Sequence, residues 1–185
     1  MKRPIRVLHL EDSLRDAEVL HDKIRTGGVS ADIVLVNSKE RFETALAGDS
    51  FDLILCDYNV PSYDGISAIK RAQEQQPDTP VIVISGSLGE DEAVKCLHTG
   101  ARDYLLKQRL DRLAPAVRRA IQEAEERRSR KEAEQALLQR ERRLSSVYAT
   151  VADCLFHLLR NCSGQKSDQE HMMSRCCNNL RGFSR

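Results

Sequence analysis

Charged and hydroxyl side chains follow four apolar segments in the first 110 residues. Glu11 and Asp12 come directly after IRVLHL, and Asp57 follows DLILC. Ser85 closes PVIVIS, and Lys107 follows DYLL. Three carboxylates gathered at one place repel one another and favour a hard cation such as Mg²⁺, which proteins hold through carboxylates, waters and phosphate oxygens. An ammonium and a hydroxyl opposite them could hold a phosphoryl group, with Asp57 as the nucleophile that forms an acyl phosphate.

The apolar segments before these side chains are typical of strands in one parallel sheet. They span residues 5–10, 31–36, 52–56, 80–85 and 103–106, and most are rich in Val, Ile and Leu without alternation, as expected when both sheet faces are covered. Amphipathic helical patterns lie between them, with Ser13 and Ser38 as candidate N-caps and Gly100 at a helix end. Strands that alternate with helices predict βαβ units, whose ligands bind at the carboxyl ends of the strands. We therefore expect the five side chains to share one site.

Each side chain also has a purely structural interpretation. An Asp at a strand end often forms a turn, and Glu11 and Asp12 could simply place negative charge at the start of a helix. Ser85 before Gly86 fits any loop, and Lys107 fits any surface. Their joint occurrence after strands one, three, four and five favours the phosphoryl site.

The complete set of motifs resembles the receiver domains of two-component response regulators, which have the CheY-like fold. The resemblance covers about residues 4–125. It comprises ED at 11–12, D-Y-N-V-P-x-x-D-G at 57–65, S-G at 85–86 and A-R-D-Y-L-x-K at 101–107. It implies an α/β fold with a doubly wound, five-stranded parallel sheet in the order 2-1-3-4-5.

The resemblance also implies a role for each site residue. Glu11, Asp12 and Asp57 would bind Mg²⁺ together with the backbone carbonyl of Asn59, and Asp57 would accept the phosphoryl group. Ser85 would move onto a phosphoryl oxygen, Lys107 would pair with it, and Tyr104 would swing inward as the aromatic switch.

Two positions depart from the common family pattern. Ser85 stands where Thr is frequent, which keeps the hydroxyl and removes a methyl group. Gln108 stands where a cis-Pro commonly follows the Lys, and a cis bond to a non-proline residue costs about 2.5–4 kcal/mol. The geometry of the loop after Lys107 is therefore left open by the sequence.

The expected function is phosphorelay signalling by a phosphoacceptor switch that is not itself an enzyme. Its partner would be a histidine kinase or a phosphotransfer protein. One alternative is a haloacid-dehalogenase-like phosphatase, which also uses an Asp nucleophile with Mg²⁺ but needs a second Asp two residues later, where Asn59 stands. A second alternative is an adaptor that works without phosphorylation, and a dinucleotide-binding domain is excluded because no G-x-G-x-x-G follows the first strand.

Composition limits the other classes of protein. The 185 residues contain no Trp and 4% aromatic residues, so base-stacking platforms and a nucleic-acid partner are not expected. No run approaches the roughly 18 apolar residues of a membrane span, which predicts a cytoplasmic protein without a membrane partner.

A long helix is predicted to follow the receiver, from about Leu110 to Leu159. Charged residues of both signs fill residues 123–135, and apolar residues then recur at spacings of three and four with only Arg140 interrupting them: Leu137, Leu144, Val147, Val151, Cys154 and Leu158. Such a heptad seam favours a parallel coiled-coil homodimer over a helix that folds back on the receiver. Residues 141–158 also resemble the start of a PAS domain. We expect a receiver at 4–125, a signalling helix at 126–160, with the PAS start from about 141, and a disordered tail at 161–185.

Overall fold

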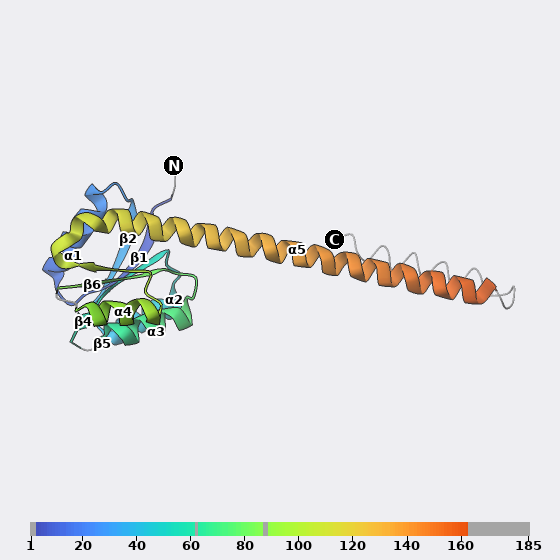
Figure 1. Ribbon diagram of the computed structural model, residues 1–185, viewed down its shortest axis with the longest axis horizontal. Coiled ribbons are helices and arrows are strands. Elements are labelled where there is room, and N and C mark those ends of the chain that lie inside the picture. The colour runs from blue at the N-terminus through green and yellow to red at the C-terminus, as the bar shows by residue number, and fades with distance from the viewer. Residues whose placement is uncertain (1–2, 62, 87–88, 163–185) are drawn as a thin grey trace. The chain divides into compact units, whose positions relative to one another are not determined.

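Five parallel strands form the central sheet of the computed structural model, which describes residues 3–61, 63–86 and 89–162 (Figure 1). The strands are β1 (Ile5–Leu10), β2 (Ala31–Val36), β3 (Leu53–Asp57), β6 (Val81–Ser85) and β7 (Asp103–Leu106). Their order is β2-β1-β3-β6-β7, and every neighbouring pair is parallel. The structure confirms the predicted 2-1-3-4-5 order, and it places the carboxyl ends of all five strands at one edge.

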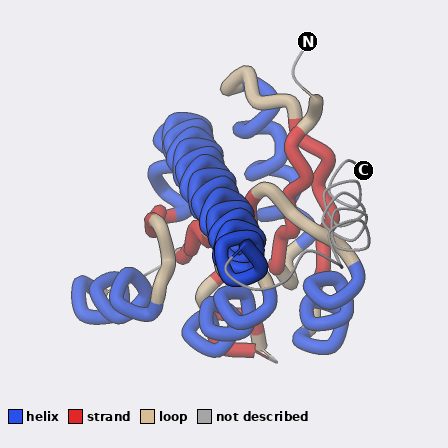
Figure 2. The backbone as a smooth tube through the Cα atoms, turned by 90° about the vertical axis from the view of Figure 1, so that its right-hand side faces the viewer, coloured by secondary structure: helices blue, strands red, loops and turns tan. Residues whose placement is uncertain are grey.

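Helices cover both faces of this sheet, because successive side chains of each strand point to opposite faces (Figure 2). Helix α1 (Leu14–Thr26) and the first turns of α5 (Leu113–Cys162) pack on one face. Helices α2 (Lys39–Gly48), α3 (Gly65–Gln75) and α4 (Glu90–Thr99) pack on the other. Burial on both faces explains why the strands read as continuous apolar runs.

The predicted helix caps are present. The hydroxyls of Ser13 and Ser38 accept hydrogen bonds from backbone N–H groups three residues later, at the starts of α1 and α2. Gly100 ends α4 with a φ of 117°, a left-handed conformation that a side chain would disfavour.

Helix α5 begins at Leu113, three residues later than predicted, after a 3₁₀ segment η1 (Lys107–Arg112). Pro115 accounts for the difference. A helix that began at Leu110 would need a hydrogen bond from the backbone N–H of residue 115, which proline lacks, whereas a helix that begins at Leu113 places the proline in its first turn.

A small hairpin follows β3 and was not predicted. Its strands β4 (Asn59–Val60) and β5 (Tyr63–Asp64) are antiparallel. Gly65 lies directly beneath it, where a Cβ atom would stand 2.8 Å from the Tyr58 ring and 2.9 Å from the Tyr58 Cα. The glycine thus allows the start of α3 to approach the residue that follows Asp57.

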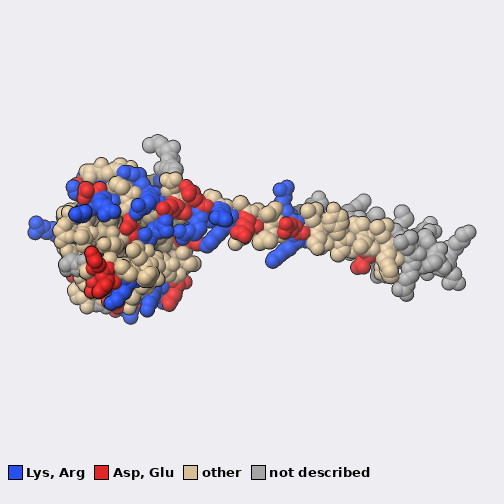
Figure 3. Space-filling model, viewed as in Figure 1, with Lys and Arg blue, Asp and Glu red and all other residues tan. Residues whose placement is uncertain are grey.

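The chain divides into two units, residues 1–129 and 130–185. The described part of the second unit is the helical segment 130–162, in which Leu137, Leu144 and Val151 are exposed. Figure 3 shows charged side chains along the earlier part of α5 and mostly uncharged ones along its later described part. Among the described residues, none of the helices combines the length and the apolar character needed to span a bilayer. The predicted tail falls mainly on residues 163–185, which lie outside the described residues.

Candidate functional site

Lys107 is the centre of a charge cluster at the carboxyl edge of the sheet. Its Nζ atom lies 2.8 Å from Glu11 Oε2, 2.9 Å from Asp57 Oδ2 and 2.6 Å from Asp16 Oδ2. Strands β1, β3 and β7 bring Glu11, Asp57 and Lys107 together from positions up to 96 residues apart. The predicted convergence of Glu11, Asp57 and Lys107 is therefore present.

Glu11, Asp12 and Asp57 also lie close enough to share a cation. Each offers a carboxylate oxygen, and these oxygens lie within 4.8 Å of one another. Glu11 and Asp57 are buried, whereas Asp12 is exposed at the mouth of the cluster. Hard oxygen donors, two of them buried and one open to water, suit a cation that keeps part of its hydration shell, as Mg²⁺ does.

Burial and hydrogen bonding shift the pKa values of this cluster in opposite directions. Burial raises the pKa of Glu11, and the hydrogen bond from Lys107 offsets this only in part. The same ammonium lowers the pKa of Asp16 through their hydrogen bond. Burial alone would lower the pKa of Lys107, but its hydrogen bonds to Asp16, Glu11 and Asp57 outweigh burial and raise that pKa above its usual range. One ammonium thus contacts three carboxyl groups, with the carboxylate of Asp12 nearby, so a further positive charge would be favourable in this cluster.

Ser85 ends β6 beside the strand that carries Asp57. Its side chain is completely buried, and its Oγ atom has no hydrogen-bond partner among the described residues. A buried hydroxyl without a partner costs about 1–3 kcal/mol, so it needs a functional or structural explanation. A ligand oxygen bound at this edge of the sheet would supply the missing partner.

The remaining predicted residues surround the cluster. The Asn59 backbone N–H donates to Asp57 Oδ1 at 3.2 Å, which orients the carboxylate. Tyr104 is half-buried and packs against the core on the α2, α3 and α4 side of the sheet. Gln108, where the family commonly has proline, donates its side-chain N–H to the Gly86 carbonyl oxygen, which links the loops after β6 and β7. Among the described residues the peptide bonds are trans, including the bond before Gln108.

Asp16 is the site residue that the sequence reasoning missed. It lies in the first turn of α1, and its backbone N–H donates to the Ser13 hydroxyl at 3.3 Å. The signal was present in the N-cap candidate Ser13, because such a cap places the residue three positions later in the first helical turn, close to the preceding strand end. Helical periodicity identifies only the apolar face of α1, to which Asp16 does not belong.

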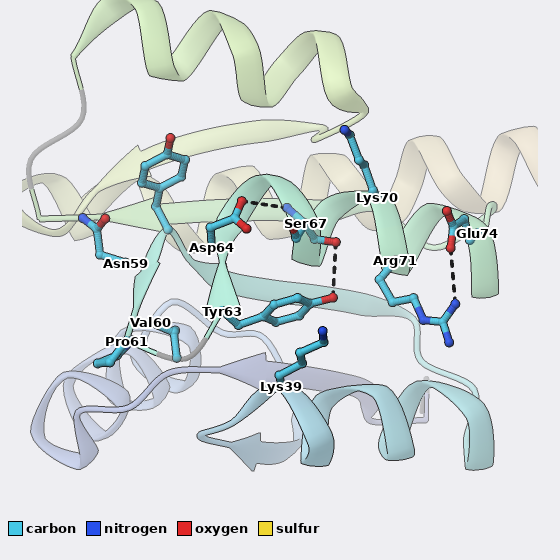
Figure 4. Close-up of a pocket in the computed structure, with 11 residues that line it drawn as sticks. Lys39, Asn59, Val60, Pro61, Tyr63, Asp64, Ser67, Lys70, Arg71 and Glu74 are labelled. Atoms are coloured by element: carbon cyan, nitrogen blue, oxygen red, sulfur yellow. Dashed lines mark hydrogen bonds and ion pairs between the residues drawn. The ribbon is translucent and has the colours of Figure 1, made fainter.

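A groove of about 660 Å³ lies beside the β4–β5 hairpin and supports the loop after Asp57 (Figure 4). Asp64 caps α3 by accepting from the Ser67 backbone N–H at 2.9 Å. The Tyr63 hydroxyl donates to the Ser67 carbonyl oxygen at 3.3 Å, and Lys39 lies 5.5 Å from the centre of the Tyr63 ring. The groove includes none of the clustered carboxylates, so its contacts hold the hairpin rather than a phosphoryl group.

A pair of histidines lies next to the cluster, on the α1 side of β1. His9 Nδ1 lies 3.0 Å from His21 Nε2, and His9 is completely buried. Burial, followed by the charges of His21 and Lys107, lowers the pKa of His9 from 6.5 to about 3. Burial also lowers the pKa of His21. Both imidazoles are therefore neutral in the folded protein near pH 7.

The free energy of unfolding is expected to fall as the pH falls from 7 to 5. His9 titrates near 3 when folded and near 6.5 when unfolded, so acid protonates the unfolded chain first. One such group gives a limiting slope of about 1.4 kcal/mol per pH unit. Urea unfolding at several pH values measures the slope. His9→Leu should flatten the profile, and a profile that parallels the wild type would show that His9 is not held neutral.

The comparisons with known proteins identify the class. The sequence model of the response regulator receiver domain matches residues 7–118. The chain belongs to this family, and the receiver prediction is confirmed. It is 31% identical to the transcriptional regulatory protein ZraR of Escherichia coli over 103 residues, which cover 56% of this chain and 23% of ZraR. It is 34% identical to the transcriptional regulatory protein FixJ of Bradyrhizobium diazoefficiens over 94 residues, which cover 50% of this chain and 46% of FixJ.

Solved structures agree with this assignment. The receiver domain of Francisella response regulator 1452 superposes with a TM-score of 0.58 at 26% identity, over 64% of this chain and 98% of that domain. The receiver homology is that of phosphorelay signalling and gives no support to the phosphatase or adaptor alternatives. The chain spans less than half the length of ZraR and of FixJ. The expectations that the protein is not an enzyme and has no nucleic-acid partner therefore stay predictions, as do the domain boundaries and the PAS start.

Proposed function

We propose that Asp57 accepts a phosphoryl group from a phosphohistidine of a histidine kinase or phosphotransfer protein. The observation that carries this proposal is the position of the Lys107 ammonium, 2.9 Å from the Asp57 carboxylate at the sheet edge where the buried Ser85 hydroxyl has no partner. A nucleophile, a cation and a hydroxyl donor thus converge where a phosphoryl group would bind.

The transfer follows from the chemistry of these groups. An Asp57 carboxylate oxygen attacks phosphorus, and a P–O bond forms as the P–N bond of the phosphohistidine breaks. The electron pair of that bond stays with the leaving imidazole nitrogen. The Asn59 N–H keeps Asp57 Oδ1 oriented, which leaves Oδ2, on the Lys107 side, as the attacking atom.

Glu11, Asp12 and Asp57 would hold Mg²⁺ with the Asn59 carbonyl. The donor set fits this ion, because three carboxylate oxygens lie within 4.8 Å of one another and one carboxylate is exposed. Bound Mg²⁺ would neutralise charge on the phosphoryl oxygens. The cytoplasm is the compartment in which we expect this phosphotransfer.

Phosphorylation would change the hydrogen bonds of two residues in particular. Ser85 would donate to a phosphoryl oxygen, which satisfies its unpartnered Oγ. Lys107 would exchange one of its three carboxylate contacts for the new anion. Tyr104, which follows the first residue of β7, is half-buried and could then move inward as the aromatic switch. The phosphorylated protein would thus act as a switch.

Asp12→Ala is expected to raise the Mg²⁺ concentration needed for half-maximal phosphorylation by a small acyl phosphate. The exposed Asp12 supplies one of three carboxylates, and losing one ligand weakens a site that has no complete protein cage. Intact-mass measurements over a Mg²⁺ titration test this and the proposed function together. Asp91→Ala, at an exposed position of α4, is the control. If the Mg²⁺ titration of Asp12→Ala matches that of Asp91→Ala, Asp12 is not part of the site.

We further propose that the chain forms a homodimer through the later part of α5. Leu137, Leu144, Val147 and Val151 are 45–59% exposed in the single chain, at heptad spacing. A second copy would bury them together. The side chain of Leu158, the last residue of the predicted seam, lies outside the described residues.

A further inference from the structure

We infer that the two copies of α5 pair in parallel and in register, with Arg140 of each copy beside Glu141 of the other. This inference rests on the proposed homodimer, keeps the parallel orientation that the sequence favours, and adds the register. It follows from the heptad positions of the exposed apolar residues and from the one charge that interrupts them.

The apolar stripe has the spacing of a two-stranded seam. With Leu137 assigned to position a of the heptad, Leu144 and Val151 also fall on a, and Val147 and Cys154 fall on d. Exposed fractions of 59%, 58% and 45% at the three a positions leave this stripe open to a partner helix. Two identical helices in register would match each layer with itself.

Arg140 occupies the remaining d position, and Glu141 occupies the adjacent e position. Both are exposed in the single chain. In a parallel, in-register pair, a d side chain packs beside the e side chain of the other helix. The layer would then contain two Arg140 and two Glu141 side chains with no net charge. The same register places Arg143 at g across from Tyr148 at e, where a guanidinium can lie over an aromatic ring.

Two other alignments that pair the apolar stripe leave one or both Arg140 side chains without an acid. An antiparallel pair that matches Leu144 with Val147 sets Arg140 against Val151, and the e-position neighbours there are Tyr148 and Leu155. A parallel pair shifted by one heptad sets Arg140 of one copy against Val147, beside Tyr148, and Arg140 of the other copy against Ala133, beside Glu134. A charge held in a seam without a counter-charge is unfavourable, so Arg140 favours the parallel, in-register pair, in which both copies have an acid beside it.

Cross-linking with a short bismaleimide tests the orientation in the full chain. Ser replaces Cys162, Cys176 and Cys177, while Cys56 and Cys96 stay because they are buried. Cys154 of one copy should then cross-link to Cys154 of the other. With Cys154→Ser added, the Leu137→Cys variant should also cross-link to itself, whereas the Leu138→Cys variant, one residue outside the seam and similarly exposed, should react several-fold more slowly.

The outcomes separate the orientation from the dimer itself. The antiparallel alignment places Leu137 across from Cys154. In an antiparallel dimer, cross-links would therefore form only in a mixture of the Cys154 chain and the Leu137→Cys chain. Cross-linking in this mixture alone would overturn the parallel assignment. A full chain that sediments as a monomer, phosphorylated or not, would overturn the proposed homodimer.

A charge exchange tests the register independently of cysteine reactivity. Arg140→Glu and Glu141→Arg should each raise the dimer dissociation constant by about ten-fold or more, because each variant places like charges side by side in the seam. The double variant restores opposite charges across the seam and should return to within about two-fold of the wild type. A double variant that is weaker than both single variants would overturn the Arg140–Glu141 contact.

Discussion

Asp57→Asn is expected to abolish phosphorylation by a small acyl phosphate in the presence of Mg²⁺. The substitution replaces the nucleophilic carboxylate by an amide of the same shape, and the amide oxygen can still accept the Asn59 N–H bond that Asp57 Oδ1 accepts at 3.2 Å. The fold should therefore persist while the reaction stops. Intact-mass spectrometry after incubation with the phosphodonor measures the phosphorylated fraction.

Asp64→Asn is the matched control for this experiment. Asp64 belongs to the same D-Y-N-V-P-x-x-D-G run but is exposed and caps α3, a role that asparagine performs equally well. The control should be phosphorylated like the wild type. If Asp57→Asn is phosphorylated to the same extent as the wild type, Asp57 is not the acceptor.

Lys107→Met is expected to cause the largest loss of stability among the site variants. Its ammonium contacts Glu11 and Asp57, whose side chains are 1% and 7% exposed. Removing one partner from a buried ion pair costs about 3–5 kcal/mol, because the remaining charge stays buried without compensation. Mg²⁺ should restore part of this loss by binding the folded state.

Urea unfolding with and without Mg²⁺ measures this effect. Lys95→Met, at an exposed position of α4, is the control and should change the free energy of unfolding by less than about 0.5 kcal/mol. Equal stabilities for the Lys107 variant and this control, with equal responses to Mg²⁺, would show that Lys107 is not the counter-ion of the cluster.

The sheet and most of the site could be predicted because both depend on short-range patterns and one topological rule. Strands buried on two faces appear as unbroken apolar runs, and a parallel sheet brings their carboxyl ends to one edge. Glu11, Asp57 and Lys107 each stand at such an end, so their contact follows from chain order. Ser85 is buried at the end of β6 for the same reason.

Features that depend on contacts between a helix and the sheet could not be predicted in this way. Asp16 reaches Lys107 only because the capping interaction with Ser13 sets the orientation of the first turn of α1. In the sequence His9 is an ordinary strand residue, and only the packing of α1 on β1 brings His21 Nε2 to 3.0 Å from His9 Nδ1. The start of α5 depends on the missing backbone N–H of Pro115. The spacing of apolar residues, from which the helix was predicted, contains no information on that N–H.

Mapping the phosphorylated residue in the wild-type protein shows directly whether Asp57 is the acceptor. Borohydride reduces an aspartyl phosphate at the acylated carbon, so peptide sequencing by mass spectrometry reads the acceptor without any substitution. The structure predicts modification at Asp57 alone, and only in samples that contained Mg²⁺ during phosphorylation. Modification at Asp12 or Asp16 with Asp57 unchanged would contradict the account.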